Sequence, residues 1–192
     1  MLTDRWLQRW LPRVSERAGN APVLEIGCGR GADTATLVAA GLHVVAFDLS
    51  PSNVAAAQAR VPQATITCQD ARAPFPDVSR PFGVVVASLS LHYFSWRDTV
   101  TLAARIHAAL QPHGLLLCRL NSTRDHHYGA QGHPAIEDNY FDVRGEPKRF
   151  FDGAAISRLF ATGWHTLSMQ ELTSYKYVLP KVLWELALER QG

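Results

Sequence analysis

A hydrophobic strand that runs into a glycine-rich turn constrains the fold of this chain more than any other feature. Val23–Ile26 is expected to be a buried strand, followed by Gly27, Gly29 and Gly31 and then by a helix over Ala32–Ala40. Glycines permit positive φ angles and let a ligand approach the backbone, and the amino end of a helix attracts an anionic group. The segment therefore predicts a strand–turn–helix unit that binds a carboxylate or a phosphate.

Strand-like and helical stretches alternate along the next hundred residues. This alternation predicts a parallel sheet with helices on both faces and right-handed crossovers. A buried run such as FGVVVAS is typical of a strand covered on both sides. The further strands are expected at His43–Phe47, Ala64–Cys68, Phe82–Ser88 and Gly114–Leu120, and the helices at Pro51–Arg60, with Ser50 as N-cap, and at Trp96–Leu110.

The carboxyl-terminal part follows a different pattern. A helix over Gly153–Thr162 is expected to precede two strands, Trp164–Leu172 and Tyr177–Leu188, although Val182–Leu188 also fits a helix. A terminal hairpin inserts its last strand beside the fifth one. The predicted fold is therefore a seven-stranded, mostly parallel α/β sheet with the order 3-2-1-4-5-7-6 and strand seven antiparallel.

The chain of 192 residues suits a single domain with one sizeable core. Residues 1–19 are expected to form an amino-terminal helical cap in which Pro12 interrupts the helix. Arg5, Arg9, Arg13 and Arg17 recur every four residues there, as a solvated basic face or as a site for an anionic substrate or nucleic acid. The polar stretch 121–150 shows little regular pattern and is expected to be a substrate lid.

Composition excludes several classes of protein. The chain is 47% hydrophobic and 19% charged, which is typical of a packed globule, and it has no apolar run long enough to span a membrane and no secretory signal. Cys28, Cys68 and Cys118 are too widely spaced for a disulfide framework or a zinc site and are expected to be buried thiols in a reducing cytoplasm. A net charge of +2 does not indicate a polyanionic partner.

The glycine turn alone does not identify a cofactor, because Gly27, Gly29 and Ala32 also fit the dinucleotide pattern G-x-G-x-x-G/A. Asp48 ends the second strand, where a carboxylate accepts the ribose hydroxyls of either NAD or S-adenosylmethionine. Glu25 inside the first strand and Gln69-Asp70-Ala71 after the third favour S-adenosylmethionine, as does the expected lack of a second domain for a nicotinamide.

Five stretches resemble, in order, the motifs of class I S-adenosylmethionine-dependent methyltransferases. They are VLEIGCGRG, VVAFDLS, QDARAPFP, SLSLHYFSW and LQPHGLLLCRLNS, within residues 20–122. The rest of the chain, with KRFF and KVLWEL, looks like small uncharacterised bacterial members and is more distantly similar to the tellurite-resistance methyltransferases. The resemblance implies a Rossmann-like three-layer fold that binds S-adenosylmethionine and releases S-adenosylhomocysteine.

The resemblance also implies roles for individual residues of this sequence. The end of the cofactor that carries the amino and carboxylate groups would lie at Glu25 and the turn Gly27–Gly31, which includes Cys28, Gly29 and Gly31. Asp48 would bind the ribose. Leu49, Asp70 and Ala71 would contact adenine, and Ser88 would lie beside the methyl group. Pro112-His113-Gly114 has one residue more than the usual Pro-Gly before the fifth strand.

Methyl transfer from a sulfonium mainly requires alignment of the nucleophile, the methyl carbon and the sulfur. His92 and Tyr93 follow the fourth strand and are the catalytic candidates; His126 and His127 lie in the lid, and no metal site is expected. The alternatives are a non-catalytic module that binds S-adenosylmethionine and an NAD-dependent dehydrogenase.

The methyl acceptor is expected to be a small molecule, because no segment is large enough for a separate recognition domain. It would enter under the lid, with Tyr128, Tyr140 and Phe141, and the amino-terminal helix around Trp6 and Trp10. Nucleic acid is not the expected acceptor, because Ser88–Leu91 stands where amino-methylating enzymes of DNA carry Asn-Pro-Pro-aromatic.

Overall fold

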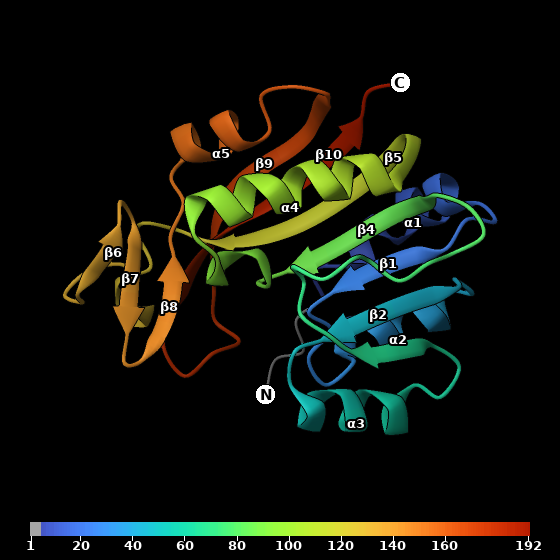
Figure 1. The fold of residues 1–192 in the computed structure, drawn as a ribbon, viewed down its shortest axis with the longest axis horizontal. Coiled ribbons are helices and arrows are strands. Elements are labelled where there is room, and N and C mark those ends of the chain that lie inside the picture. The colour runs from blue at the N-terminus through green and yellow to red at the C-terminus, as the bar shows by residue number, and fades with distance from the viewer. Residues whose placement is uncertain (1–4) are drawn as a thin grey trace.

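The computed structural model describes residues 5–192 and contains a seven-stranded sheet in the order β3-β2-β1-β4-β5-β10-β9 (Figure 1). Neighbours from β3 to β5 are parallel, whereas β10 runs antiparallel to both β5 and β9. The predicted order is confirmed, and the segment that fitted both a strand and a helix is a strand. The strands are β1 (Val23–Ile26), β2 (Val44–Asp48), β3 (Thr65–Cys68), β4 (Phe82–Ser88), β5 (Leu110–Asn121), β9 (Trp164–Ser174) and β10 (Lys181–Arg190).

Helices cover both faces of the sheet and form the three expected layers (Figure 1). Alternate residues of β4 point to opposite faces: Val85 packs with α4 and α5, whereas Val84 packs with α1, α2 and α3. This explains why β4 reads as a continuous apolar run. The helices are α1 (Leu11–Ala18), α2 (Ala32–Ala39), α3 (Pro51–Arg60), α4 (Trp96–Ala109) and α5 (Gly153–Leu159), with short 3-10 turns η1 (Gln8–Trp10), η2 (Leu91–Tyr93) and η3 (His126–Tyr128). None of the helices described in residues 5–192 is long and apolar enough to cross a membrane.

Capping residues set the start of several helices. Ser50 accepts a hydrogen bond from the Asn53 N–H at the start of α3, as predicted, and Asp152 caps α5 through the Ala155 N–H. Pro12 lies in the first turn of α1, where its missing N–H is not needed. The α-helix does not extend through Pro12 towards the amino terminus, as expected: it begins at Leu11, and the preceding residues form the 3-10 turn η1. Residues 1–4 of that cap lie outside the described residues.

Two arginines of the amino-terminal stripe attach α1 to the sheet. Arg9 pairs with Glu185, and Arg17 pairs with Glu189 at 2.5 Å, both acids lying on β10. These two side chains are therefore neither a purely solvated face nor a free anion site, which corrects both alternatives. Of the three cysteines, which form no disulfide, Cys28 and Cys118 are buried as expected, but Cys68 is exposed at the end of β3.

The predicted lid contains regular structure that was not expected from the sequence. Strands β6 (Ala135–Glu137), β7 (Tyr140–Val143) and β8 (Glu146–Arg149) form a small antiparallel sheet beside the main one (Figure 1). We call this element the lid sheet. Its strands are short and mostly exposed, so they lack the apolar alternation that would reveal them in the sequence.

Candidate active site

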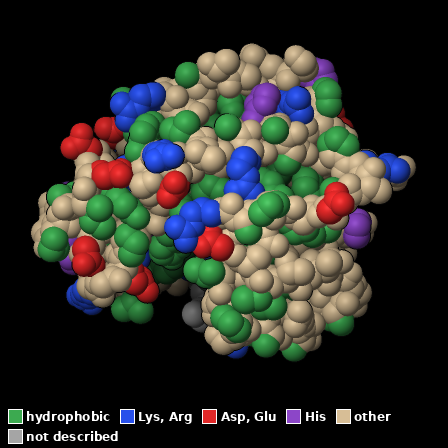
Figure 2. Space-filling view, in the orientation of Figure 1, with side chains coloured by type: hydrophobic (Ala, Val, Ile, Leu, Met, Phe, Trp, Pro, Cys, Tyr) green, Lys and Arg blue, Asp and Glu red, His purple; other side chains and the backbone are tan. Residues whose placement is uncertain are grey.

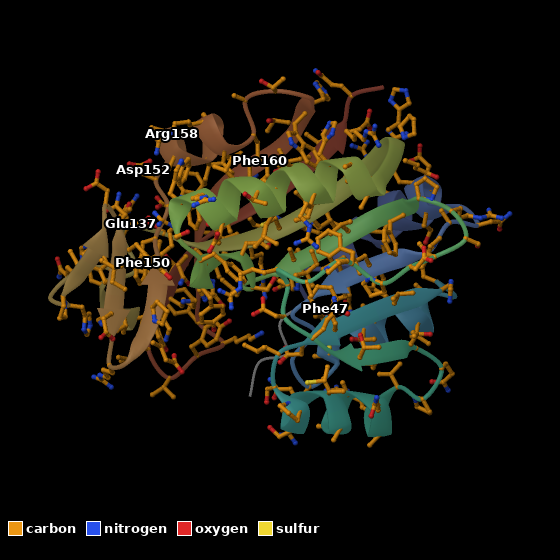
Figure 3. All side chains as sticks on the ribbon, viewed as in Figure 1. Phe47, Glu137, Phe150, Asp152, Arg158 and Phe160 are labelled. Atoms are coloured by element: carbon orange, nitrogen blue, oxygen red, sulfur yellow. The ribbon has the colours of Figure 1, made fainter. Side chains whose placement is uncertain are left out.

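A cavity of about 930 Å³ opens at the carboxyl ends of β1, β2 and β3. Figure 2 shows the surface hollowed between this edge and the lid sheet, and Figure 3 shows Phe47 on β2 on one side and Glu137 of the lid sheet on the other. The wall comes from five segments: the glycine turn, the end of β2, the loop after β3, the β4–α4 connection and the lid sheet. Its lining residues are Ile26, Gly27, Gly29, Phe47–Ser50, Asn53, Gln69–Arg72, Leu89, Ser90, Tyr93–Ser95, Asp98, Tyr140 and Gly145–Pro147.

The three glycines of the first turn all have positive φ angles, 72° at Gly27, 54° at Gly29 and 77° at Gly31. A Cβ at Gly27 would lie 2.5 Å from the Cβ of Ser90, and one at Gly31 would lie 3.1 Å from the Cβ of Ala57. A Cβ at Gly29 would meet nothing within 4 Å. Gly27 and Gly31 thus permit close packing, whereas Gly29 leaves free space on the cavity wall.

Asp48 is held at the cavity wall by backbone and side-chain donors. Its Oδ2 accepts from the Gly29 N–H at 2.9 Å, and its Oδ1 accepts from the Ser50 N–H at 2.9 Å and from Asn53 Nδ2 at 3.1 Å. The carboxylate therefore links the glycine turn to the start of α3. Asn53 was not among the residues predicted from the sequence; its place on the first turn of α3, three residues after the N-cap, was the available signal.

The loop after β3 is fixed by two arginines. Arg72 donates to Asp70 from its backbone N–H at 2.8 Å and from its guanidinium at 2.6 Å, and this partner lowers the pKa of Asp70. Arg105 of α4 donates to the Ala71 carbonyl at 2.9 Å and covers the ring of Phe75. These hydrogen bonds hold Asp70 and Ala71 at the cavity wall.

Glu25 lies fully buried beneath the glycine turn, where it accepts a hydrogen bond from Thr34 Oγ1 at 2.5 Å. Burial raises the pKa of Glu25 to about 8, and the carboxylates of Asp33 and Asp48 add to the rise. The free protein therefore carries Glu25 mostly protonated at neutral pH. Ser88 accepts from Arg119 Nε at 3.0 Å.

The two catalytic candidates differ in their surroundings although their rings lie 4.2 Å apart. Tyr93 lines the cavity, and partial burial raises its pKa. His92 is buried and is not among the lining residues; burial, with the charges of Lys181 and Lys148, lowers its pKa to about 3. His92 is therefore a neutral imidazole and a poor base at neutral pH.

The lid sheet is attached to the β4–α4 connection. The Tyr140 hydroxyl donates to the Tyr93 carbonyl at 3.0 Å, and Arg149 Nε donates to the Phe94 carbonyl at 3.0 Å. The carboxylate of Glu137 accepts from the Trp96 N–H at 2.9 Å and pairs with Arg149. These contacts hold the lid residues Tyr140 and 145–147 against the cavity.

Comparisons with known proteins agree with this geometry. A family model described as a methyltransferase domain matches residues 23–114. A curated relative, an uncharacterized methyltransferase of Synechocystis sp. (strain ATCC 27184 / PCC 6803 / Kazusa), is 32% identical over 93 residues, which cover 48% of this chain and 43% of the relative. Residues 23–114 therefore form a methyltransferase domain, and their motifs resemble those of the class I S-adenosylmethionine-dependent methyltransferases. The match spans less than half the length of the curated relative.

Solved structures share the fold of this methyltransferase domain. A magnesium protoporphyrin IX methyltransferase from Synechocystis PCC 6803, crystallised with bound S-adenosylmethionine, has a TM-score of 0.70 at 16% identity and covers 97% of this chain and 77% of its own. A Burkholderia thailandensis 1,6-didemethyltoxoflavin-N1-methyltransferase, with 1,6-didemethyltoxoflavin and S-adenosylhomocysteine bound, has a TM-score of 0.71 at 20% identity and covers 97% of this chain and 78% of its own. The matching family model describes a methyltransferase and not a dehydrogenase, which favours S-adenosylmethionine over NAD, the two cofactors that the glycine turn left open.

Within the methyltransferase domain, the structure brings together part of the expected site. Six of the residues predicted to contact the cofactor line the cavity: Gly27, Gly29, Asp48, Leu49, Asp70 and Ala71. The other four do not line it: Glu25, Cys28, Gly31 and Ser88. Tyr128, Phe141, Trp6 and Trp10 also lie outside its lining. No group of three or more His, Cys, Asp or Glu side chains in residues 5–192 is placed to hold a metal ion.

Proposed function

We propose that the chain transfers the methyl group of S-adenosylmethionine to a small-molecule acceptor. The observation that carries this proposal is the composition of the cavity, which has cofactor-type groups at one end and aromatic groups at the other. Asp48, Asp70 and Gly29 lie at the first end, and Tyr93 and Tyr140 at the second. Its volume, about 930 Å³, falls at the upper end of ordinary ligand sites, which supports a cofactor and an acceptor side by side.

The lining residues fit the cofactor group by group. Asp48 would accept the ribose hydroxyls, Leu49 and Ala71 would pack on the adenine, and Asp70 would accept from its amino group. The free space at Gly29 would admit the amino-acid end of the cofactor. Ser90 Oγ supports this fit, because it is buried at the cavity without a hydrogen-bond partner in residues 5–192.

Glu25, Cys28, Gly31 and Ser88 would support the site from behind. Gly31 permits the close contact of the turn with Ala57, and Ser88 is fixed by Arg119. Glu25 would act on the cofactor ammonium through charge, and approach of that cation favours its ionised form.

The bound cofactor supplies an activated methyl group on a sulfonium. The protein's own contribution is orientation, which is worth about 7–11 kcal/mol in well-aligned systems. Tyr93 is the catalytic candidate that touches the cavity, where its hydroxyl would orient the acceptor. His92 would act as a positioning residue through its ring contact with Tyr93.

The test is a transfer assay with S-adenosylmethionine that is deuterated in its methyl group, incubated with the protein and a small-molecule cell extract. Mass spectrometry should detect S-adenosylhomocysteine together with a new compound that carries the deuterated methyl group. Binding of the cofactor without any transfer would favour the non-catalytic module. Absence of cofactor binding would refute the proposal.

A further inference from the structure

The wall of the cavity carries an excess of negative charge. Its described lining contains one basic side chain, Arg72, and four carboxylates, those of Asp48, Asp70, Asp98 and Glu146. Arg72 is already engaged, because its Nε donates to both carboxylate oxygens of Asp70 at 3.1 Å. Asp48 accepts hydrogen bonds from the glycine turn and from α3 at the cofactor end. Asp98 and Glu146 therefore remain for a second ligand.

Asp98 lies on the first turn of α4, where an acid usually serves the helix itself. It is the third residue after the N-cap Ser95, the position from which the carboxylate of a capping box accepts the N-cap N–H. Ser95 Oγ accepts from the Asp98 N–H at 3.1 Å, but the Asp98 carboxylate makes no bond in return and has no hydrogen-bond or ion-pair partner within residues 5–192. This half-buried carboxylate therefore faces the cavity without a protein donor.

Glu146 approaches the cavity from the lid sheet, at the start of β8. Its carboxylate pairs with Lys148 at 3.0 Å, but its side chain stays 65% exposed. An ion pair as exposed as this contributes little, so a cation in the cavity can compete for the carboxylate. The hydrogen bond from Arg149, on the same strand, to the Phe94 carbonyl holds β8 beside the residues that precede α4. The lid sheet thus brings the second free acid to the part of the wall that contains Asp98.

An accessible aromatic ring belongs to the same part of the lining. Tyr93 lies in η2, directly before α4, and is 45% exposed. Tyr140 of the lid sheet donates its hydroxyl to the Tyr93 carbonyl at 3.0 Å, but Arg149 already covers the Tyr140 ring at 4.7 Å. The ring that a ligand can reach is therefore that of Tyr93. The face of an aromatic ring attracts a cation, so this ring and the two carboxylates favour the same kind of ligand.

We propose that the methyl acceptor carries a cationic nitrogen group, a protonated alkylamine or a quaternary ammonium, which is bound by the carboxylates of Asp98 and Glu146 against the ring of Tyr93. The proposal rests on the proposed function for the identity of this ligand as the acceptor, whereas the cation site itself does not depend on catalysis. The bound group anchors the acceptor and does not receive the methyl group, because a protonated or quaternary nitrogen has no lone pair with which to attack the methyl carbon. The nucleophile is therefore another atom of the same molecule.

The test uses the protein saturated with S-adenosylhomocysteine, which lacks the positive sulfonium, and a library of alkylamines and quaternary ammonium compounds. Each cation is paired with a neutral isostere that has a hydroxyl or tert-butyl group in its place. Thermal unfolding should show stabilisation by some of the cations and by none of their neutral partners. Asp98→Asn and Glu146→Gln should each weaken the binding of such a cation at least tenfold, while the affinity for S-adenosylhomocysteine stays unchanged. Asp77→Asn, which removes an exposed negative charge from the β3–β4 connection outside the cavity lining, is the matched control and should have no effect.

The same variants separate the acceptor from the sulfonium of the cofactor. If the two carboxylates serve the acceptor, the ratio of the affinities for S-adenosylmethionine and S-adenosylhomocysteine stays close to the parent value in both variants. A selective loss of S-adenosylmethionine binding, with no change for the library cations, would assign the carboxylates to the sulfonium and overturn the proposal.

Three further outcomes would overturn the cation site: neutral isosteres that bind as well as their cations, a library in which no cation binds, or full cation affinity in both Asp98→Asn and Glu146→Gln. Failure of the proposed function looks different. In that case a cation binds and responds to the substitutions, but no molecule that carries it receives a methyl group from S-adenosylmethionine.

Discussion

Replacing Arg149 by methionine should release the lid sheet while leaving the cofactor end of the cavity in place. Arg149 is buried and donates to the Phe94 carbonyl at 3.0 Å and to the Asp138 carbonyl at 3.1 Å. It also stacks on the ring of Tyr140 at 4.7 Å. Methionine keeps an unbranched apolar stem of similar length, so the substitution removes mainly the guanidinium.

The loss can be estimated from these contacts. Each hydrogen bond from a charged donor contributes about 1.5–3 kcal/mol, so the two carbonyl bonds together contribute about 3–6 kcal/mol. The pair with the partly exposed Glu137 adds little, about 0–1 kcal/mol. A loss of this size is enough to shift the lid sheet from mostly attached to mostly detached, since about 1.4 kcal/mol is a tenfold change in an equilibrium.

The assay compares three quantities in the parent, Arg149→Met and Arg144→Met. Arg144 lies exposed in the β7–β8 turn and is the matched control. In Arg149→Met, hydrogen exchange of the amides in β8 should accelerate, and formation of S-adenosylhomocysteine with an acceptor from the extract should fall at least tenfold. The affinity for S-adenosylhomocysteine should stay within about tenfold, ~1.4 kcal/mol. Turnover at the parent rate despite a detached lid sheet would refute the idea that the lid sheet is needed for methyl transfer. A loss of cofactor affinity as large as the loss of turnover would place Arg149 in the cofactor site instead.

Further predictions concern four residues around the cavity. Asp48→Asn should weaken S-adenosylhomocysteine binding by tenfold to a hundredfold, about 1.4–2.8 kcal/mol, in calorimetry; unchanged affinity would remove Asp48 from the ribose site. Gly29→Val should weaken binding further, because the residue has a φ of 54° and the new side chain would occupy the free space at the turn; parent-like affinity would contradict this. Cofactor binding at pH 7 should release a proton from Glu25, whose pKa is about 8, and titrations in buffers of different ionisation enthalpy should detect it. The raised pKa of Glu25 should also make the free protein less stable as pH rises from about 4.5 to about 8, because in that range the Glu25 carboxyl loses its proton only in the unfolded chain. The opposite holds for His92: stability should fall as pH drops from about 6.5 to about 3, since only the unfolded chain gains the proton, and His92→Gln should reduce this acid sensitivity in chemical denaturation.

The features that could be predicted from the sequence are those with a local physical cause. The β1–α2 unit follows from an apolar run and three glycines, and the start of α3 follows from Ser50 and Pro51. The antiparallel place of β10 followed from a terminal pair of strand-like segments, although the residues 182–188 alone fitted a helix equally well. In each case the residues involved are close in sequence.

The features that were missed depend on contacts between distant residues. The lid sheet has too few buried side chains to show a period, and its attachment through Arg149 and Glu137 joins segments that no local pattern connects. The role of Arg9 became visible only with its partner Glu185, 176 positions away. His92 and Tyr93 were equivalent as sequence neighbours, and burial alone separates a neutral histidine from a tyrosine that faces the cavity.

The electron density of S-adenosylhomocysteine in crystals of the complex would test the assignment of the cavity most directly. We predict that the ribose hydroxyls lie within hydrogen-bond distance of Asp48, that the adenine lies between Leu49 and Ala71, and that the sulfur faces Tyr93. Density for the ligand outside this cavity, or a ribose away from Asp48 in a correctly folded chain, would contradict the assignment.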